Sequence, residues 1–150
     1  MIQIKRAENK DKDEIKKLVL TVLEEFHMSG LKTKTEDLAN LERYYFSRRG
    51  TFLIAVDGEK IVGTVAVENF ESKAPNTALL RRFYVDKGYR RQGIGKRLME
   101  EIIKEAKILG YKKIVLGSEH EFKDAHKAYL AAGFTEYKRD EISVYFEKDI

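Results

Sequence analysis

The spacing of apolar residues predicts a chain that begins with one strand and two helices. Residues 2–7 (IQIKRA) alternate apolar and polar side chains, as in a half-buried strand. Asn9 or Asp11 can cap the helix that follows, in which apolar residues recur at helical spacing over residues 15–26. The same spacing predicts a second helix over residues 35–46, with its own threonine cap.

From residue 51 the apolar pattern changes to that of strands. Segments 51–56 and 60–70 are rich in β-branched residues and are joined by Asp57-Gly58, a strong hairpin signal. Segment 77–85 (TALLRRFYV) is a third strand in succession. These three segments predict an antiparallel meander.

The C-terminal half mixes both periodicities. The expected elements are a long amphipathic helix that ends at Gly110, a strand over 112–118, a short helix over 123–133, and closing strands over 134–140 and 142–148. The complete pattern predicts a mixed α/β fold with a central, mostly antiparallel, twisted sheet of about six or seven strands, flanked by about four helices.

Composition supports a single globular unit. The chain has 150 residues, 43% hydrophobic and 36% charged, with one proline and no Gly/Ser-rich linker, so we expect one domain over residues 1–150. There is no cysteine, which excludes disulfides, thiolate metal ligands and a cysteine nucleophile. The start of the chain lacks the apolar core of a signal peptide, and no run reaches membrane-spanning length. These features favour the cytoplasm and predict no membrane partner.

A glycine turn carries the chemistry. Residues 88–101 (GYRRQGIGKRLMEE) place Gly93 and Gly95 where the third strand of the meander gives way to the long helix. A helix start presents unpaired N–H groups and a partial positive charge, which attract phosphate. Glycines permit positive φ and let a ligand approach the backbone. The turn is therefore a candidate phosphate cradle, although a tight turn with solvated basic side chains has the same composition.

Two better-known phosphate motifs do not fit this turn. A dinucleotide fingerprint needs a third glycine where Leu98 stands. A P-loop needs lysine and then serine or threonine after Gly93, but Ile94 and Gly95 follow. The net charge of +4 suits anionic ligands in general. Acidic residues interrupt the basic ones, so nucleic acid is an unlikely partner.

Two motifs resemble the GNAT family of acyl-CoA-dependent N-acetyltransferases. The family hallmark, Gln/Arg-x-x-Gly-x-Gly/Ala, is matched by residues 90–95 (RRQGIG). Residues 125–134 (AHKAYLAAGF) are similar to the family's A-x-x-x-Y-x-x-x-G-F block near the end of the domain. The order of strands and helices also matches over nearly the whole chain. One departure is Phe122, which stands where the family has an asparagine.

The resemblance implies a fold and a co-substrate. Two central parallel strands splay apart, and acetyl-CoA binds at the opening, with no metal. The pyrophosphate would lie on the turn formed by Arg90, Arg91, Gln92, Gly93, Ile94, Gly95 and Lys96. The pantetheine arm would pair with the exposed backbone of Phe83, Tyr84 and Val85, since an extended amide chain can bind an unpaired strand edge.

The resemblance also implies direct acetyl transfer to a primary amine of a small molecule or peptide in a ternary complex. Tyr129 matches the tyrosine that protonates the CoA sulfur, although aromatic residues on short helices more often pack in a core. The general base has no matching carboxylate. The candidates are Glu68, Glu71, Glu119, His120 or a water chain.

Two alternatives stay open. The missing base favours a non-catalytic domain of the same fold that binds or senses acyl-CoA. The last strand, over residues 142–147, could pair across a two-fold axis in a homodimer.

Overall fold

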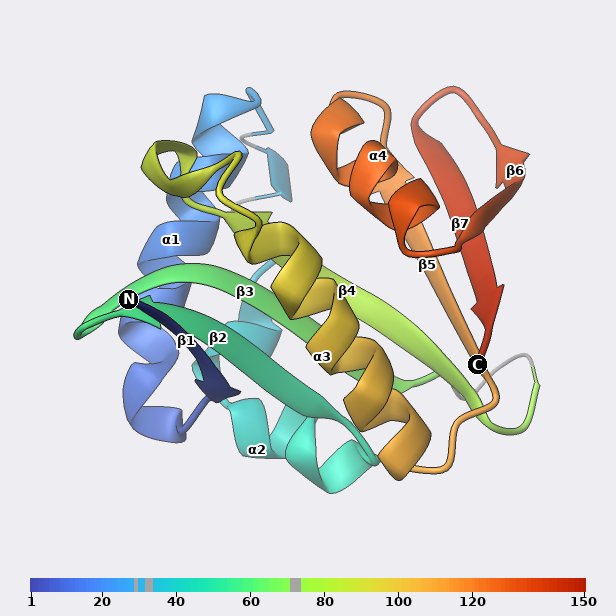
Figure 1. Cartoon of the computed structure of the whole chain (residues 1–150), viewed down its shortest axis with the longest axis horizontal. Coiled ribbons are helices and arrows are strands. Elements are labelled where there is room, and N and C mark those ends of the chain that lie inside the picture. The colour runs from blue at the N-terminus through green and yellow to red at the C-terminus, as the bar shows by residue number, and fades with distance from the viewer. Residues whose placement is uncertain (29, 32–33, 71–73) are drawn as a thin grey trace.

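Seven strands form one sheet in the order β1-β2-β3-β4-β5-β7-β6 (Figure 1). The computed structural model describes residues 1–28, 30–31, 34–70 and 74–150. All neighbouring strands are antiparallel except the central pair β4 and β5, so the expected mixed sheet and its meander are confirmed. The strands are β1 (Ile2–Arg6), β2 (Thr51–Asp57), β3 (Lys60–Asn69), β4 (Thr77–Val85), β5 (Lys113–Glu119), β6 (Thr135–Arg139) and β7 (Ser143–Asp149).

Helices cover both faces of this sheet (Figure 1). The helices are α1 (Lys12–Glu25), α2 (Leu41–Tyr44), α3 (Ile94–Ile108) and α4 (Lys123–Ala131). Helices α1 and α2 pack on one face, and α3 and α4 pack on the other. Within the described residues, no helix is both long and apolar enough to cross a bilayer.

The sheet separates two hydrophobic cores. Along β2, Leu53 and Ala55 face the core under α3, whereas Phe52 and Ile54 face the core under α1. Successive side chains of a strand point to opposite faces, so a strand covered on both sides needs apolar residues at every position. This explains why the segment TFLIAV is buried throughout.

The expected second helix over residues 35–46 is wrong. The segment instead forms two 3-10 turns, Glu36–Ala39 and Phe46–Arg48, on either side of the four-residue α2. Asn40 interrupts the helix with an extended backbone (φ −154°), and its side-chain oxygen accepts a hydrogen bond from the Arg43 N–H at 3.0 Å. An asparagine that caps a new turn competes with continuation of the preceding one.

The central parallel strands separate soon after they meet, as the resemblance implied. Thr77–Leu79 of β4 pair with Lys113–Val115 of β5, and beyond this point no β4 residue pairs with β5. A bulge lies in the separating part of β4, where the register with β3 shifts and Arg82 adopts a left-handed backbone (φ +58°). Bulges bend and twist a strand. The bend therefore opens a wedge in the middle of the sheet.

Candidate functional site

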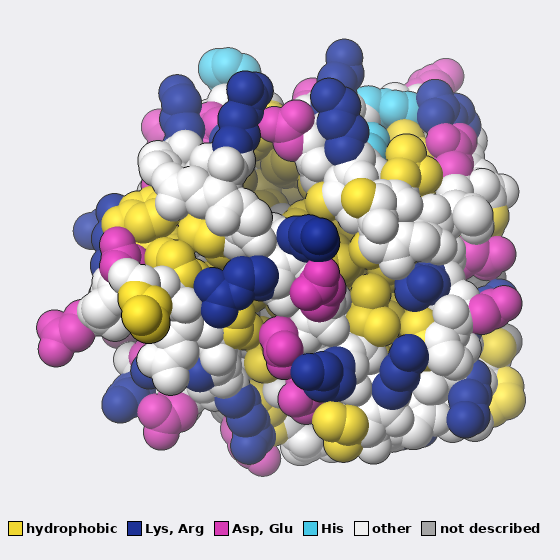
Figure 2. All heavy atoms as spheres, viewed as in Figure 1, with side chains coloured by type: hydrophobic (Ala, Val, Ile, Leu, Met, Phe, Trp, Pro, Cys, Tyr) yellow, Lys and Arg dark blue, Asp and Glu magenta, His cyan; other side chains and the backbone are white. Residues whose placement is uncertain are grey.

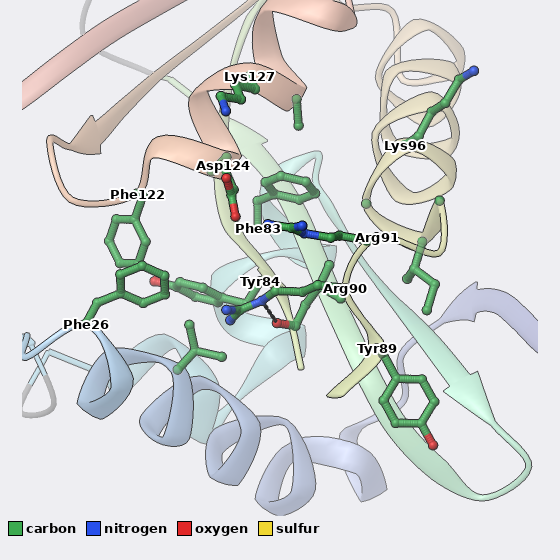
Figure 3. Close-up of a pocket in the computed structure, with 17 residues that line it drawn as sticks. Phe26, Phe83, Tyr84, Tyr89, Arg90, Arg91, Lys96, Phe122, Asp124 and Lys127 are labelled. Carbon is green, nitrogen blue, oxygen red and sulfur yellow. Dashed lines mark hydrogen bonds between the residues drawn. The ribbon is translucent and has the colours of Figure 1, made fainter. Parts of the chain in front are cut away.

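A cavity of about 550 Å³ opens at the wide end of this wedge, between α1, the end of β4, the start of α3 and α4 (Figure 3). Figure 2 shows the hollow on the same face, with hydrophobic side chains inside it and Lys and Arg around it. Nine of the ten residues expected at the cofactor line this cavity: Phe83, Tyr84, Val85, Arg90, Arg91, Gly93, Ile94, Gly95 and Lys96. The tenth, Gln92, is exposed and does not line it.

The glycine turn directs unpaired N–H groups outward at the start of α3. Gly93 is the N-cap and has a left-handed backbone (φ +80°), which glycine adopts without strain. The first helical hydrogen bond runs from the Arg97 N–H to the Gly93 carbonyl at 3.1 Å, so the N–H groups of residues 94–96 have no helical acceptor. Such a helix start binds anions.

Gly95 has no side chain, which lets β4 pack closely against this turn and leaves the backbone of the turn accessible to a ligand. A Cβ atom there would lie 3.3 Å from Cζ of Phe83, tighter than an ordinary contact. Gly95 thus lets the start of α3 pack against β4 while the backbone stays accessible from the cavity.

One edge of β4 has no strand partner along the cavity. The Asp86 N–H donates to the Val62 carbonyl of β3 at 2.8 Å, so alternation turns the backbone groups of Tyr84 toward β3 and those of Phe83 and Val85 away from it. This outward side is where β5 has separated. Two of the three residues expected to pair with pantetheine therefore present their backbone to the cavity, while Tyr84 presents its side chain.

Arg90 is held by the protein itself. Its guanidinium forms a bidentate pair with Glu25 of α1, at 2.5 and 2.9 Å. Its Nε donates to the Val85 carbonyl at 3.0 Å, the dashed line in Figure 3. Both side chains are about one-quarter exposed. Arg90 thus ties α1 to the end of β4, with its charge already compensated. Sequence reasoning missed Glu25, because 65 residues separate the two partners.

The other charges around the cavity come from the turn and from α4. Figure 3 shows Arg91, Asp124 and Lys127 beside Phe83, whereas the Lys96 side chain points away along α3. Arg91 is exposed and adopts a left-handed backbone (φ +63°). The cation that the cavity offers beside the turn is therefore Arg91 rather than Arg90.

Tyr129 lies in a second, smaller cavity of about 60 Å³ that adjoins the first. The two cavities share Phe83, Tyr84, Phe122 and Ala125. A path therefore leads from the glycine turn along β4 to Tyr129. Phe122, at the position of the family's asparagine, stands at the junction. It packs on Phe26, the residue that follows α1, with ring centroids 4.8 Å apart.

Tyr129 is both packed and directed into this cavity. It is 5% exposed, and its ring lies 5.6 Å from that of Phe83 and 5.3 Å from that of Phe146. Burial raises the pKa of the phenol well above its ordinary value, and the nearby Ser118 hydroxyl partly opposes that rise. The phenol therefore stays protonated at neutral pH.

The four expected bases lie in different places. Glu119 lines the small cavity with Tyr129. His120 directs its Nε2 to the Asp140 carbonyl at 2.7 Å, and Glu68 pairs with Arg81 at 2.8 Å; neither lines the two cavities. Glu71 lies outside the described residues. Glu119 is the described candidate that lines the same cavity as Tyr129.

Sequence reasoning missed a serine–histidine pair beside Tyr129. Ser118 Oγ lies 3.0 Å from Nε2 of His126. His126 precedes Tyr129 by three residues on α4, a spacing that places two side chains on one helix face. That spacing was a readable signal, whereas the approach of Ser118 needed the sheet.

A buried ionic cluster at the β4 bulge was also missed. Asp37 accepts hydrogen bonds from Arg82 at 2.7 and 3.0 Å and from the Tyr45 hydroxyl at 2.5 Å. Arg82 also donates to the Lys34 carbonyl at 2.8 Å. Burial raises the pKa of Asp37, but its hydrogen bonds and attraction to Arg82 outweigh that effect, so the pKa is lowered. Arg82 has the left-handed backbone of the bulge, so this cluster holds the bend that opens the sheet.

Among the described residues there is no group of three or more His, Asp or Glu side chains placed to hold a metal ion.

A wedge between parallel strands, with a helix start at its mouth, defines an acyltransferase-type α/β fold. Comparison with known proteins gives the family. The model of the Acetyltransferase (GNAT) family matches residues 16–134, and the chain belongs to this family.

Individual relatives agree with this assignment. The chain is 37% identical over 120 residues to N-acetylaspartate synthetase from Xenopus tropicalis. The matched region covers 79% of this chain and 41% of that protein. An acetyltransferase of the GNAT family from Staphylococcus aureus Mu50 has the same fold, with a TM-score of 0.90, 28% identity and 99% of each chain covered. The PaiA N-acetyltransferase from Thermoplasma acidophilum, solved in complex with coenzyme A, shares the fold (TM-score 0.81, 19% identity, 100% and 99% covered). The chain spans about two fifths or less of the N-acetylaspartate synthetases that it matches.

Proposed function

We propose that this protein is an N-acetyltransferase that moves an acetyl group from acetyl-CoA to a primary amine by direct attack in a ternary complex. The observation that carries the proposal is the continuous path from the free N–H groups of α3, along the unpaired edge of β4, to Tyr129. A domain that only senses acyl-CoA has no use for a phenol at the end of that path.

The residues present fit an acyl-CoA. The N–H groups of Ile94, Gly95 and Lys96, with Arg91, would hold the pyrophosphate, and exposed Gln92 would border it. The backbone of Phe83 and the N–H of Val85, whose carbonyl accepts from Arg90, would hydrogen-bond the pantetheine amides. Acetyl-CoA supplies an activated thioester, and N–H groups of the same strand edge would polarise its carbonyl. In this proposal Arg90 is a structural residue and not a phosphate ligand, because it connects α1 to the end of β4 through Glu25 and the Val85 carbonyl.

Tyr129 is proposed as the general acid for the departing sulfur and Glu119 as the base for the acceptor. Glu119 lines the small cavity, and a carboxylate there would attract an ammonium and accept its proton directly or through water. The acceptor is a small molecule or peptide with a primary amine. Aspartate is the first to test, because the similar N-acetylaspartate synthetases bear its name. Cytoplasmic localisation and the formation of a homodimer remain predictions.

The test is thiol release from acetyl-CoA in the presence of a panel of amines, with aspartate among them, alongside calorimetric titration with coenzyme A. We expect saturable binding of coenzyme A and amine-dependent thiol release. Binding without thiol release from any amine would favour the sensing domain. Absence of binding would contradict both functions.

Gly95→Val is expected to weaken coenzyme A binding at least about tenfold, or ~1.4 kcal/mol. The new side chain would meet Phe83 and fill the space through which the backbone of the turn is reached. Gly88→Ala is the matched control, because its Cβ would make an ordinary 3.5 Å contact with Asp86 Oδ1 outside the cavity. Calorimetry checks affinity and circular dichroism checks folding. Equal affinities in the two variants would remove the turn from the cofactor site.

A further inference from the structure

The proposed role of Tyr129 as an acid requires a source of protons inside a buried site. Each turnover takes one proton from its hydroxyl, but the side chain is 5% exposed. A buried phenolate with a raised pKa is a strong base in a site with little access to water. The phenol must regain a proton before the next turnover, and a buried group regains it fastest through neighbouring hydrogen-bonding groups.

Ser118 and His126 lie in the position to supply it. Ser118 is buried on β5 and lines the small cavity with Tyr129. Its Oγ is 3.0 Å from Nε2 of His126, and the His126 ring stacks beside Tyr129 with centroids 6.4 Å apart and an interplanar angle of 29°. His126 is half-buried, so the pair includes one residue with partial access to water.

The surroundings of His126 suit proton exchange near neutral pH. Burial lowers the pKa of His126, and a hydrogen bond with the Glu119 carbonyl opposes this effect. The charges that act on the ring are His120 and Arg139, which lower its pKa, and Glu136, which raises it. The ring is therefore mostly neutral at pH 7 and takes up a proton transiently, as a relay group needs.

We infer that Ser118 and His126 form a proton relay that restores the Tyr129 hydroxyl in each turnover. This inference rests on the proposed function and extends it. The O–H bond of Tyr129 breaks as the S–H bond of the product thiol forms. Neutral His126 first takes a proton from solvent. Tyr129 then takes a proton from Ser118 Oγ as Ser118 takes one from Nε2 of the imidazolium form of His126, which returns the ring to its neutral form. Solvent also receives the proton lost by the acceptor amine, so protons and charge balance over the cycle.

The competing explanation is purely structural: the hydrogen bond between Ser118 and His126 attaches α4 to β5. The two explanations differ in their dependence on Tyr129. A structural hydrogen bond would affect kcat equally whether or not residue 129 has a hydroxyl, whereas a proton relay has no role once that hydroxyl is gone.

The experiment is a double-mutant cycle on kcat, measured by thiol release with the best acceptor of the panel. Ser118→Ala and His126→Asn should each lower kcat about tenfold, a fraction of the effect of a direct acid, with KM for acetyl-CoA within about twofold of the parent. In the Tyr129→Phe background the same changes should cause no further loss. Ser118→Thr, which keeps the hydroxyl, should retain activity. Ser143→Ala, which removes a buried hydroxyl outside both cavities on the neighbouring strand β7, is the control.

A solvent-isotope measurement separates transfer from packing. The plot of kcat against deuterium fraction should curve in the parent, because several protons move, and become linear in Ser118→Ala. Losses that are equal in both backgrounds, or unchanged kcat in both single variants, would overturn the relay while the acetyltransferase assignment stands. An inactive parent with every amine would overturn the enzyme assignment and the relay together.

Discussion

Tyr129→Phe is expected to lower kcat for acetyl transfer by about 10²-fold or more, the usual contribution of a positioned general acid. KM for acetyl-CoA should change little, because the lost hydroxyl acts on the departing sulfur and not on the bound nucleotide. Phenylalanine keeps the ring contacts with Phe83 and Phe146, so the fold should be retained. Steady-state thiol release over a range of acetyl-CoA concentrations gives both constants.

Tyr137→Phe is the matched control for this experiment. Tyr137 is 48% exposed on β6 and lines neither of the two cavities, so its variant should match the parent. If Tyr129→Phe also matched the parent in kcat, the tyrosine would be a packing residue, and sulfur protonation would have to come from water or another group.

Asp37→Ala is expected to destabilise the fold by roughly 3–5 kcal/mol, because it leaves a buried charge without its partner. The side chains of Asp37 and Arg82 are 5% and 8% exposed, and they form two hydrogen bonds to each other. Removing both charges in Asp37→Ala/Arg82→Met should cost less than the two single changes added together. Urea unfolding of all three variants measures these free energies.

Acid provides a second test of the same cluster. The pKa of Asp37 is lower in the folded protein than its ordinary value of about 3.8, because Arg82 and the Tyr45 hydroxyl stabilise the carboxylate. Its contribution is therefore complete above about pH 4 and disappears as the pH falls through the folded pKa. The stability gap between the parent and Asp37→Asn should narrow below about pH 4. A constant gap, or an Asp37→Ala cost no greater than that of exposed Asp13→Ala, would show that the cluster does not hold the bulge.

The sequence predicted most of the fold because most of its elements are locally encoded. Alternation identified β1, Asp57-Gly58 marked the hairpin, and the long amphipathic repeat identified α3 up to Gly110. The second helix was wrong because spacing alone cannot tell whether Asn40 continues a helix or caps a new turn. In this segment a single side-chain hydrogen bond, and not hydrophobic periodicity, decides the backbone.

The site was predictable where function depends on backbone in a short motif, and not where it depends on pairs far apart in sequence. The glycine turn and its strand were found because Gly93 and Gly95 stand together. The sequence around Arg90 does not show that its guanidinium pairs with Glu25, because a charged residue in a sequence does not reveal its partner. The approach of Ser118 to His126, and of Asp37 to Arg82, depends on how the sheet and helices pack.

The short parallel contact between β4 and β5 has a consequence for what the wedge admits. Its free backbone lies inside the sheet, with strands on both sides, and not along an outer border. A polypeptide strand carries a side chain at every residue, and in this gap those side chains would point alternately to the two faces of the sheet, toward the helices that line the cavity. A thin linear molecule whose amides are separated by bare methylenes can enter, which makes the gap a filter for slender ligands before any individual contact discriminates among them.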